Sequence, residues 1–201
     1  LALESLTTGF DNVAFGDAAM QKTTTGNRNT AIGLSALAKN TIGDHNIALG
    51  QNALGYNLSG TYNTALGIDA LQYGDACNFN IAIGQYAALN LTGAISNTVA
   101  GYNTFATATS GDRNAAYGKD TLANQSGVDG NTAIGTEAGR DNISGTYLVL
   151  LGHRAARSNT TGTHITAIGD NAAYKNTTGT HNIAVGYTAV FNNVSASWNI
   201  G

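Results

Sequence analysis

A five-residue pattern of polar and apolar positions recurs along the chain. It is clearest at residues 131–135, which read Asn-Thr-Ala-Ile-Gly, and it returns at residues 29–33, 63–67 and 182–186. The glycines that close the pattern follow one another at intervals of 17 residues. They are Gly16, Gly33, Gly50, Gly67, Gly84, Gly101, Gly118, Gly135, Gly152, Gly169 and Gly186. So many glycines at one period cannot arise by chance, and the chain is therefore a repeat protein.

Within the pattern, side chains alternate in the manner of a β-strand. Asn131, Ala133 and Gly135 fall on one side of an extended segment, and Thr132 and Ile134 fall on the other. Neither side carries charge in most repeats, which indicates a strand that is covered on both faces. We therefore expect the residue before each glycine, such as Ile134, to belong to a buried apolar ladder.

The residues after each glycine predict how the chain turns back. A small residue and then an apolar residue follow, as in Ala36-Leu37 and Ala53-Leu54, which predicts a second short strand or a tight bend. A polar run then leads to a second glycine, as in residues 176–179. Two glycines at fixed positions in each repeat are typical of two chain reversals.

A 17-residue repeat with this arrangement is typical of one rung of a β-solenoid. Its content of Gly, Thr and Asn disfavours a helix. The uninterrupted period predicts a single all-β domain over residues 1–201, with about 11 to 12 rungs. At the spacing of parallel strands, these rungs would form a rod about 50–60 Å long. We interpret the chain as a fragment of a longer fibre, because the last repeat stops at Gly201.

An asparagine opens the pattern in most repeats, and we expect these side chains to form a hydrogen-bonded amide ladder. Leu148 and Ile165 replace the asparagine in two neighbouring repeats. The residues that we expect to build the common ladder of the rungs include Asn29, Gly33, Asn63, Gly67, Asn131, Ile134, Gly135 and Gly186.

Composition narrows the function. Charged residues make up only 10% of the chain and the net charge is −3, so we expect neither nucleic-acid binding nor membrane insertion. The single cysteine, Cys77, excludes an internal disulfide, and its place in the second glycine series predicts a small buried residue. No nucleophile or metal-ligand spacing occurs. We therefore expect no enzyme activity, no catalytic residue, no cofactor and no metal site.

The pentad and its trailing Ala-Leu pair resemble the head repeats of the YadA-like trimeric autotransporter adhesins and the related repeats of phage tail fibres and bacterial surface fibres. The resemblance covers the whole chain. The asparagine stands four residues before the glycine here, as at Asn29 and Asn131, whereas the family's N-S-V-A-I-G has it five residues before, and the repeat here is longer. The departure favours the fibre branch of these proteins.

The resemblance implies a left-handed parallel β-roll, three chains side by side in a homotrimer, and a role in attachment to a cell surface. A rung of this length encloses a thin core, which also favours self-association. We therefore expect a structural and adhesive fibre segment, extracellular on a cell surface or in a virion tail fibre. Its partners would be further copies of itself and a cell-surface glycan or protein receptor.

The residue before each asparagine is the candidate ligand-binding position, because planar and cationic side chains dominate it. The candidates are Tyr62, Phe79, Arg113, Tyr147, His164, His181 and Trp198. Such a strip suits the stacking of sugar rings, and the alternative is self-stacking of the rings over a turn. His164 and His181 lie one repeat apart, but they lack a third ligand for a metal ion.

Two further patterns leave alternatives open. An ice-binding solenoid would need two parallel threonine columns on a flat face, and the loop columns are too irregular for it. Asn-x-Ser/Thr triplets resemble glycosylation sites, but their position in the loops indicates turn chemistry. The triplets start at Asn57, Asn90, Asn124, Asn142, Asn159, Asn176 and Asn193.

The stretch from Arg140 to Arg157 is the least regular part of the repeat. Leu150 stands where most repeats have alanine, and Gly139 and Ala156 replace the apolar residue after the first turn. We interpret the stretch as drift within one rung, with a local binding patch as the alternative.

Overall fold

The computed structural model describes residues 1–201, and its regular elements are eleven strands of three residues. No helix long and apolar enough to cross a membrane is present. The strands are β1 (Val13–Phe15), β2 (Thr30–Ile32), β3 (Ile47–Leu49), β4 (Thr64–Leu66), β5 (Ile81–Ile83), β6 (Thr98–Ala100), β7 (Ala115–Tyr117), β8 (Thr132–Ile134), β9 (Val149–Leu151), β10 (Thr166–Ile168) and β11 (Ile183–Val185). The chain divides into two compact units, residues 1–98 and 99–201, which are described separately.

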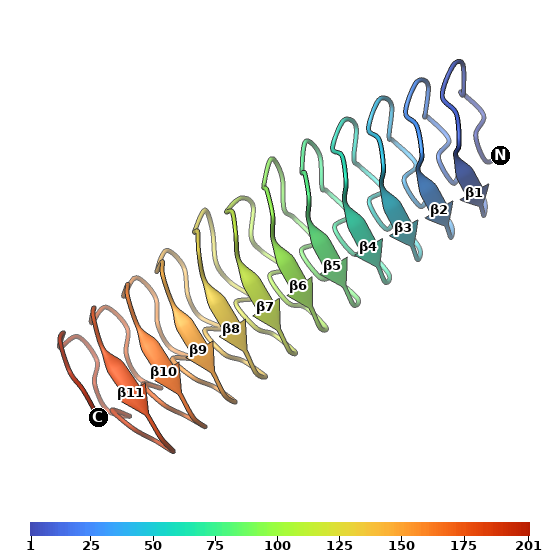
Figure 1. Ribbon diagram of the computed structural model, residues 1–201. Coiled ribbons are helices and arrows are strands. Elements are labelled where there is room, and N and C mark those ends of the chain that lie inside the picture. Colours follow the sequence, from blue (N-terminus) through green and yellow to red (C-terminus); the bar gives the residue numbers. More distant parts are fainter. The chain divides into compact units, whose positions relative to one another are not determined.

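In each unit, successive strands pair in parallel. In the first unit, Ala31 of β2 pairs with Ala14 of β1 and with Ala48 of β3. In the second unit, Ala133 of β8 pairs with Ala116 of β7, and the register again advances by one 17-residue repeat. Each unit is therefore a parallel β-solenoid with one strand per rung, as the period predicts (Figure 1).

Outside the strands, each rung consists mainly of turns and bends. Of the two structures expected after each glycine, the tight bend is therefore confirmed and the second short strand is wrong. Ser35 and Leu37 both have a left-handed backbone, with φ of 55° and 53°. The Ala36 N–H donates to the Gly33 carbonyl at 3.3 Å, and the Leu37 N–H reaches the Ala53 carbonyl of the next rung at 2.9 Å. Because every second residue of this segment has a left-handed backbone, the segment forms consecutive turns and cannot form an extended strand.

The core of each unit lies between the strand and the bend. Ala31 and Ala48 point inward from the strands, and Leu37 and Leu54 point inward from the bends; all four are fully buried. The strand side that carries Asn and Ala is therefore the inner side. A thin rung has room for a small strand residue opposite each leucine and for little more.

The buried ladder predicted at the residue before each glycine is wrong for a single chain. Ile134 is 46% exposed and Phe15 is 74% exposed, because alternation turns this residue outward. Adjacent residues of a strand point to opposite sides, so Ile134 cannot be buried within the same chain when Ala133 points inward.

The predicted amide ladder is confirmed. The Asn29 Oδ1 accepts from the Asn46 backbone N–H at 2.9 Å and from the Asn46 Nδ2 at 3.1 Å. The same Nδ2 donates to the Gly60 carbonyl at 2.8 Å. At the break in the ladder, the Leu148 backbone N–H still donates to the Asn131 Oδ1 at 3.0 Å, so that the last amide oxygen is satisfied.

A second buried amide ladder lies in the polar run. The Asn57 Nδ2 donates to the Asn40 Oδ1 at 3.0 Å and to the Gly60 carbonyl at 3.0 Å, and the Asn57 Oδ1 accepts from the Gly60 N–H. In the second unit the ladder returns from Asn142 through Asn159 to Asn176.

The second ladder supports turn chemistry for most of the Asn-x-Ser/Thr triplets. Asn57, Asn142, Asn159 and Asn176 have no exposed surface and are committed to hydrogen bonds within the rungs. Asn124 is exposed and stands one position earlier in its rung, outside the ladder.

The two glycine series meet different constraints. Gly33 has φ of +135°, and a Cβ there would lie 2.6 Å from the Gly50 carbonyl oxygen. Gly60 does not have a left-handed backbone, but a Cβ there would lie 2.4 Å from the Cys77 carbonyl oxygen. Both series therefore allow neighbouring rungs to approach closely. Cys77 itself is fully buried, as its position predicts, and its thiol donates to the Leu91 carbonyl at 3.4 Å.

The irregular stretch in the second unit compensates for its own substitutions. A Cβ on Gly139 would lie 2.6 Å from the Leu150 Cδ1 and 2.7 Å from the Leu122 Cδ2. Leu150, which replaces the usual strand alanine, thus fills the space that an apolar residue at position 139 fills in other rungs. This exchange of a large and a small residue across the core supports drift as the origin of the substitutions.

A double-mutant cycle tests this exchange. Gly139→Leu alone should overpack the rung and cost about 1–3 kcal/mol. Leu150→Ala alone should leave a cavity and cost about 2–5 kcal/mol. The double variant restores the usual strand-alanine and bend-leucine pair, so its loss of unfolding free energy, measured by denaturant titration, should be well below the sum of the single losses. Additive losses would show that the two side chains do not share one space.

Candidate functional surfaces

The aromatic column of the first unit forms a stack along the rungs. The His45 and Tyr62 ring centroids lie 4.6 Å apart with planes inclined by 14°. The Tyr62 and Phe79 rings follow at 5.0 Å and 6°. Each ring comes from the same position of successive rungs, immediately before the ladder asparagine.

The second unit carries a longer stack at the same position. Tyr147 and His164 are 5.1 Å apart, His164 and His181 are 4.7 Å apart, and His181 and Trp198 are 4.1 Å apart between centroids. Arg113 occupies this position in an earlier rung, where its guanidinium lies 3.5 Å from the Asp129 carboxylate. The structure thus places the candidate residues in two ring stacks and one ion pair.

Stacking within the chain covers the ring faces that sugars would need. Tyr62 is 50% exposed, but neighbours stand on both sides of its ring, so the exposed part is mainly the ring edge. His164 is flanked in the same way by Tyr147 and His181. Self-stacking therefore accounts for this column better than a continuous sugar-binding strip does.

The backbone at these positions explains why stacking matters. Tyr62, His164 and Trp198 have left-handed φ values of 58°, 55° and 63°, a conformation that costs a non-glycine residue about 1–2 kcal/mol. Gly130 fills the same position in one rung and avoids that cost. A stacked ring pair contributes about 0.5–1.5 kcal/mol and offsets much of it.

Replacement of Tyr147 and His164 by alanine should therefore destabilise the second unit. The variant keeps the left-handed residues but loses the Tyr147–His164 and His164–His181 pairs. Thermal unfolding should show a midpoint lower by a few degrees, equivalent to about 1–3 kcal/mol. An unchanged midpoint together with loss of binding on a glycan array would instead support a sugar-binding role for the column.

The outward strand face is the second candidate surface, and we define it as the first and third residues of each strand. It contains no charged residue. In the first unit it presents Ile47 and Leu49, and in the second unit Ile134, Ile183 and Val185, all more than one third exposed. Aliphatic side chains in regular rows are therefore open on one side of each solenoid unit.

A shallow groove of about 280 Å³ adjoins the outward strand face in the second unit. His181 and Trp198 supply one wall from the aromatic stack, and Ile183 and Ile200 supply the other from the strand side. Its lining is mainly apolar, so it extends the outward strand face toward the aromatic stack.

An ion-pair network occupies the irregular stretch of the second unit. The Glu137 carboxylate accepts from the Arg154 Nε at 3.0 Å and from the Arg157 Nε at 2.8 Å. The Arg140 Nε donates to the Asp141 carboxylate at 2.9 Å, and Arg157 reaches the same carboxylate at 3.5 Å. The three arginines are thus bound to carboxylates of their own chain, which disfavours the local binding patch.

Two opposing effects act on the Glu137 carboxyl group. Burial acts to raise its pKa, but the hydrogen bonds from Arg157 and Arg154 and the attraction of Arg157 and Arg140 outweigh burial and lower the pKa from its usual value of 4.5. Because the folded pKa lies below the unfolded one, this group stabilises the fold above about pH 4.5. That contribution is lost as the pH falls through the folded pKa.

The second unit should accordingly lose stability in acid through Glu137. The unfolding free energy of the wild type should fall as the pH is lowered below 4.5. Glu137→Gln should be less stable than the wild type near pH 7 and should show a shallower fall in acid. If the unfolding free energies of the two proteins fell equally with pH, the ion-pair network would not be lowering the pKa of Glu137 in the folded state.

No group of three or more His, Cys, Asp and Glu side chains is placed to hold a metal ion. His153 Nδ1 lies 2.8 Å from the Asp170 carboxylate, an exposed pair between neighbouring rungs.

Comparison of the chain with family models, curated proteins and solved structures finds no match. The resemblance to YadA-like repeats therefore rests on the repeat pattern alone.

Proposed function

We propose that this chain is a structural and adhesive segment of an extracellular attachment fibre, in which copies of the solenoid associate side by side. The observation that carries the proposal is the outward strand face, an uncharged surface in each unit on which exposed aliphatic side chains alternate with threonines at the first strand position and predominate at the third. Exposed apolar patches of this regularity mark interaction surfaces in soluble proteins.

Self-association is the most economical use of this face. Residues such as Ile47 and Leu49 recur with the period of the rungs, so a second copy in register would offer matching rows. Each large aliphatic side chain that becomes fully buried contributes up to about 1.5–3 kcal/mol. Three copies are the expected number, as the resemblance to trimeric adhesins implies.

The remaining surface suits a presenting rod. The amide ladders give each rung the same backbone geometry, and the turns carry residues of varied chemistry, such as Asp17, Gln51 and Lys119 after the ladder glycines. A rigid support with variable turns can hold a receptor-binding element away from the surface that bears the fibre.

An ice-binding solenoid is the alternative of a different class. On the outward strand face, Thr30 and Thr64 alternate with Ile47 and Ile81, so there is one interrupted threonine column and not the two parallel columns that ice binding would need. Thermal hysteresis in a dilute sample would favour the alternative.

The assembly proposal is tested by a charge on the outward strand face. The wild type should scatter light with three times the mass of one chain at micromolar concentration. Ile134→Asp should reduce the mass to that of the single chain, because an unpaired carboxylate in a buried apolar contact is costly.

Ile143→Asp is the matched control, since Ile143 is similarly exposed, at 52%, but belongs to a turn. This variant should keep the wild-type mass. A stable, folded wild-type monomer on dilution, or an Ile134→Asp variant that still assembles, would overturn side-by-side association through this face.

A further inference from the structure

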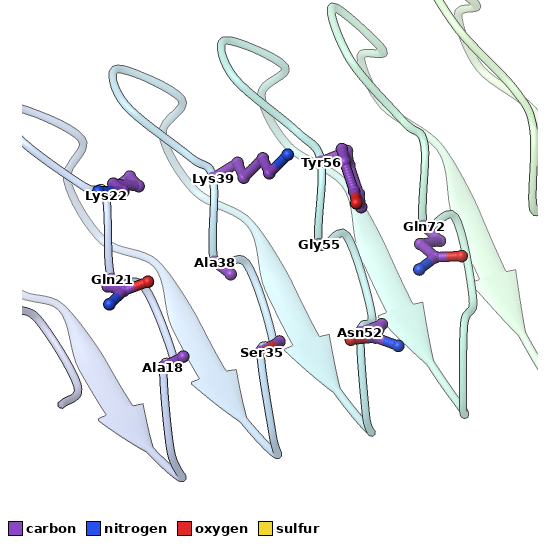
Figure 2. Close-up of a pocket in the computed structure, with 10 residues that line it drawn as sticks. All are labelled: Ala18, Gln21, Lys22, Ser35, Ala38, Lys39, Asn52, Gly55, Tyr56 and Gln72. Carbon is purple, nitrogen blue, oxygen red and sulfur yellow. The ribbon is translucent and has the colours of Figure 1, made fainter.

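A groove of about 350 Å³ crosses the bend side of the first unit. Its floor is formed by Ala38 and Gly55, and the amide side chains of Gln21 and Gln72 stand at its two ends (Figure 2). Lys22, Lys39 and Tyr56 border it along one side.

Two neighbouring rungs carry small residues, Ala38 and Gly55, at the floor of the groove, and the same position holds alanine again at 106 and 123. The same position of the repeat holds Leu89, Arg157, Tyr174 and Phe191 elsewhere, so the rung accepts large side chains there. Ala38 is only half-buried, and a larger side chain would extend into the groove. Packing within the chain therefore does not require the depression.

The charged residues that line the groove are both lysines. Lys22 and Lys39 stand one rung apart, and neither forms an ion pair with a carboxylate. The Lys39 Nζ lies 3.8 Å from the centre of the Tyr56 ring, which holds the ammonium group beside the groove. The Glu4 and Asp69 carboxylates lie outside the lining and accept hydrogen bonds from Gln21 and Asn52, so they hold these two amides in place.

The neutral polar groups of the groove point to a hydroxyl-rich ligand. Asn52 donates through Nδ2 to Asp69, which leaves its Oδ1 as an acceptor. Ser35 and Gln72 add a hydroxyl and an amide on the same side of the unit. Amides and hydroxyls around a groove of this volume match the size and hydrogen-bonding needs of one or two sugar rings.

We propose that this groove binds an acidic sugar, with the ligand carboxylate at the Lys39 ammonium group and the ring hydroxyls against Ser35, Asn52 and Gln72. The site lies on the bend side of the first unit and does not depend on association through the outward strand face. It is distinct from the aromatic stacks.

Titration with a glucuronate disaccharide, followed by NMR shifts or calorimetry, tests the proposal. The wild type should bind it, and affinity should fall as salt is added, because ions screen the lysine charges. The corresponding neutral glucose disaccharide should bind at least about tenfold more weakly, since a charge-assisted contact is lost. Inorganic phosphate should not compete at equal concentration.

Two variants and a matched control locate the site. Lys39→Gln should weaken binding about tenfold, and Ala38→Leu should abolish it by filling the groove while the thermal midpoint stays close to that of the wild type. Lys175→Gln changes a lysine at the same position of a rung in the second unit and should leave binding unchanged. The assembly variant Ile134→Asp should also bind, which separates this proposal from that of the fibre.

No binding by the wild type at millimolar sugar, equal affinity for the neutral sugar, or full competition by phosphate would overturn the proposal. Unchanged affinity in both Lys39→Gln and Ala38→Leu would also overturn it, because the sugar would then bind elsewhere.

Discussion

The buried asparagine amides are the interaction on which the rest of the structure depends. Where the ladder is unbroken, an amide oxygen accepts from the backbone and the side chain of the next rung, as Asn29 does from Asn46. The Nδ2 also donates to the carbonyl at the second glycine position, which is Gly60 for Asn46 and Cys77 for Asn63. A buried amide without partners costs about 1–3 kcal/mol, so a shift of register would be penalised in every rung. The close approach of neighbouring rungs then requires glycine wherever a Cβ would meet a carbonyl.

The inward position of the asparagine side chains determines which strand residues face outward. A strand alternates, so an inward Asn131 and Ala133 force Thr132 and Ile134 outward, and the rung has no further layer to cover them. The same constraint that makes the chain a solenoid thus leaves an uncharged aliphatic face on each unit. The proposed side-by-side association would cover this face, and the small interior, which supplies little buried area, favours it.

The repeat period allowed the parallel register, the first amide ladder and the burial of Cys77 to be predicted, because each depends only on residues 17 positions apart. The inner and outer sides of the strand could not be assigned, since Ala133 and Ile134 are both apolar and both sides lack charge. The bend was equally ambiguous, because Ser35 and Leu37 give no sign of a left-handed backbone. The second amide ladder could not be predicted, because asparagine is common in turns and Asn57 and its equivalents therefore looked like ordinary turn residues.

Positions that differ from the other rungs show where packing within the chain dictates the residue and where it does not. Leu150 departs from alanine, but Gly139 opposite departs from the usual apolar residue, so the two changes explain each other through the core. The arginines of the same stretch are likewise bound by Glu137 and Asp141. Ala38 and Gly55 stand at a position that varies from rung to rung, and nothing in the first unit fills the space beside them. The open space and the two lysines without ion pairs favour the proposed ligand site, and they distinguish this groove from the aromatic stacks, whose ring faces are already occupied by their neighbours.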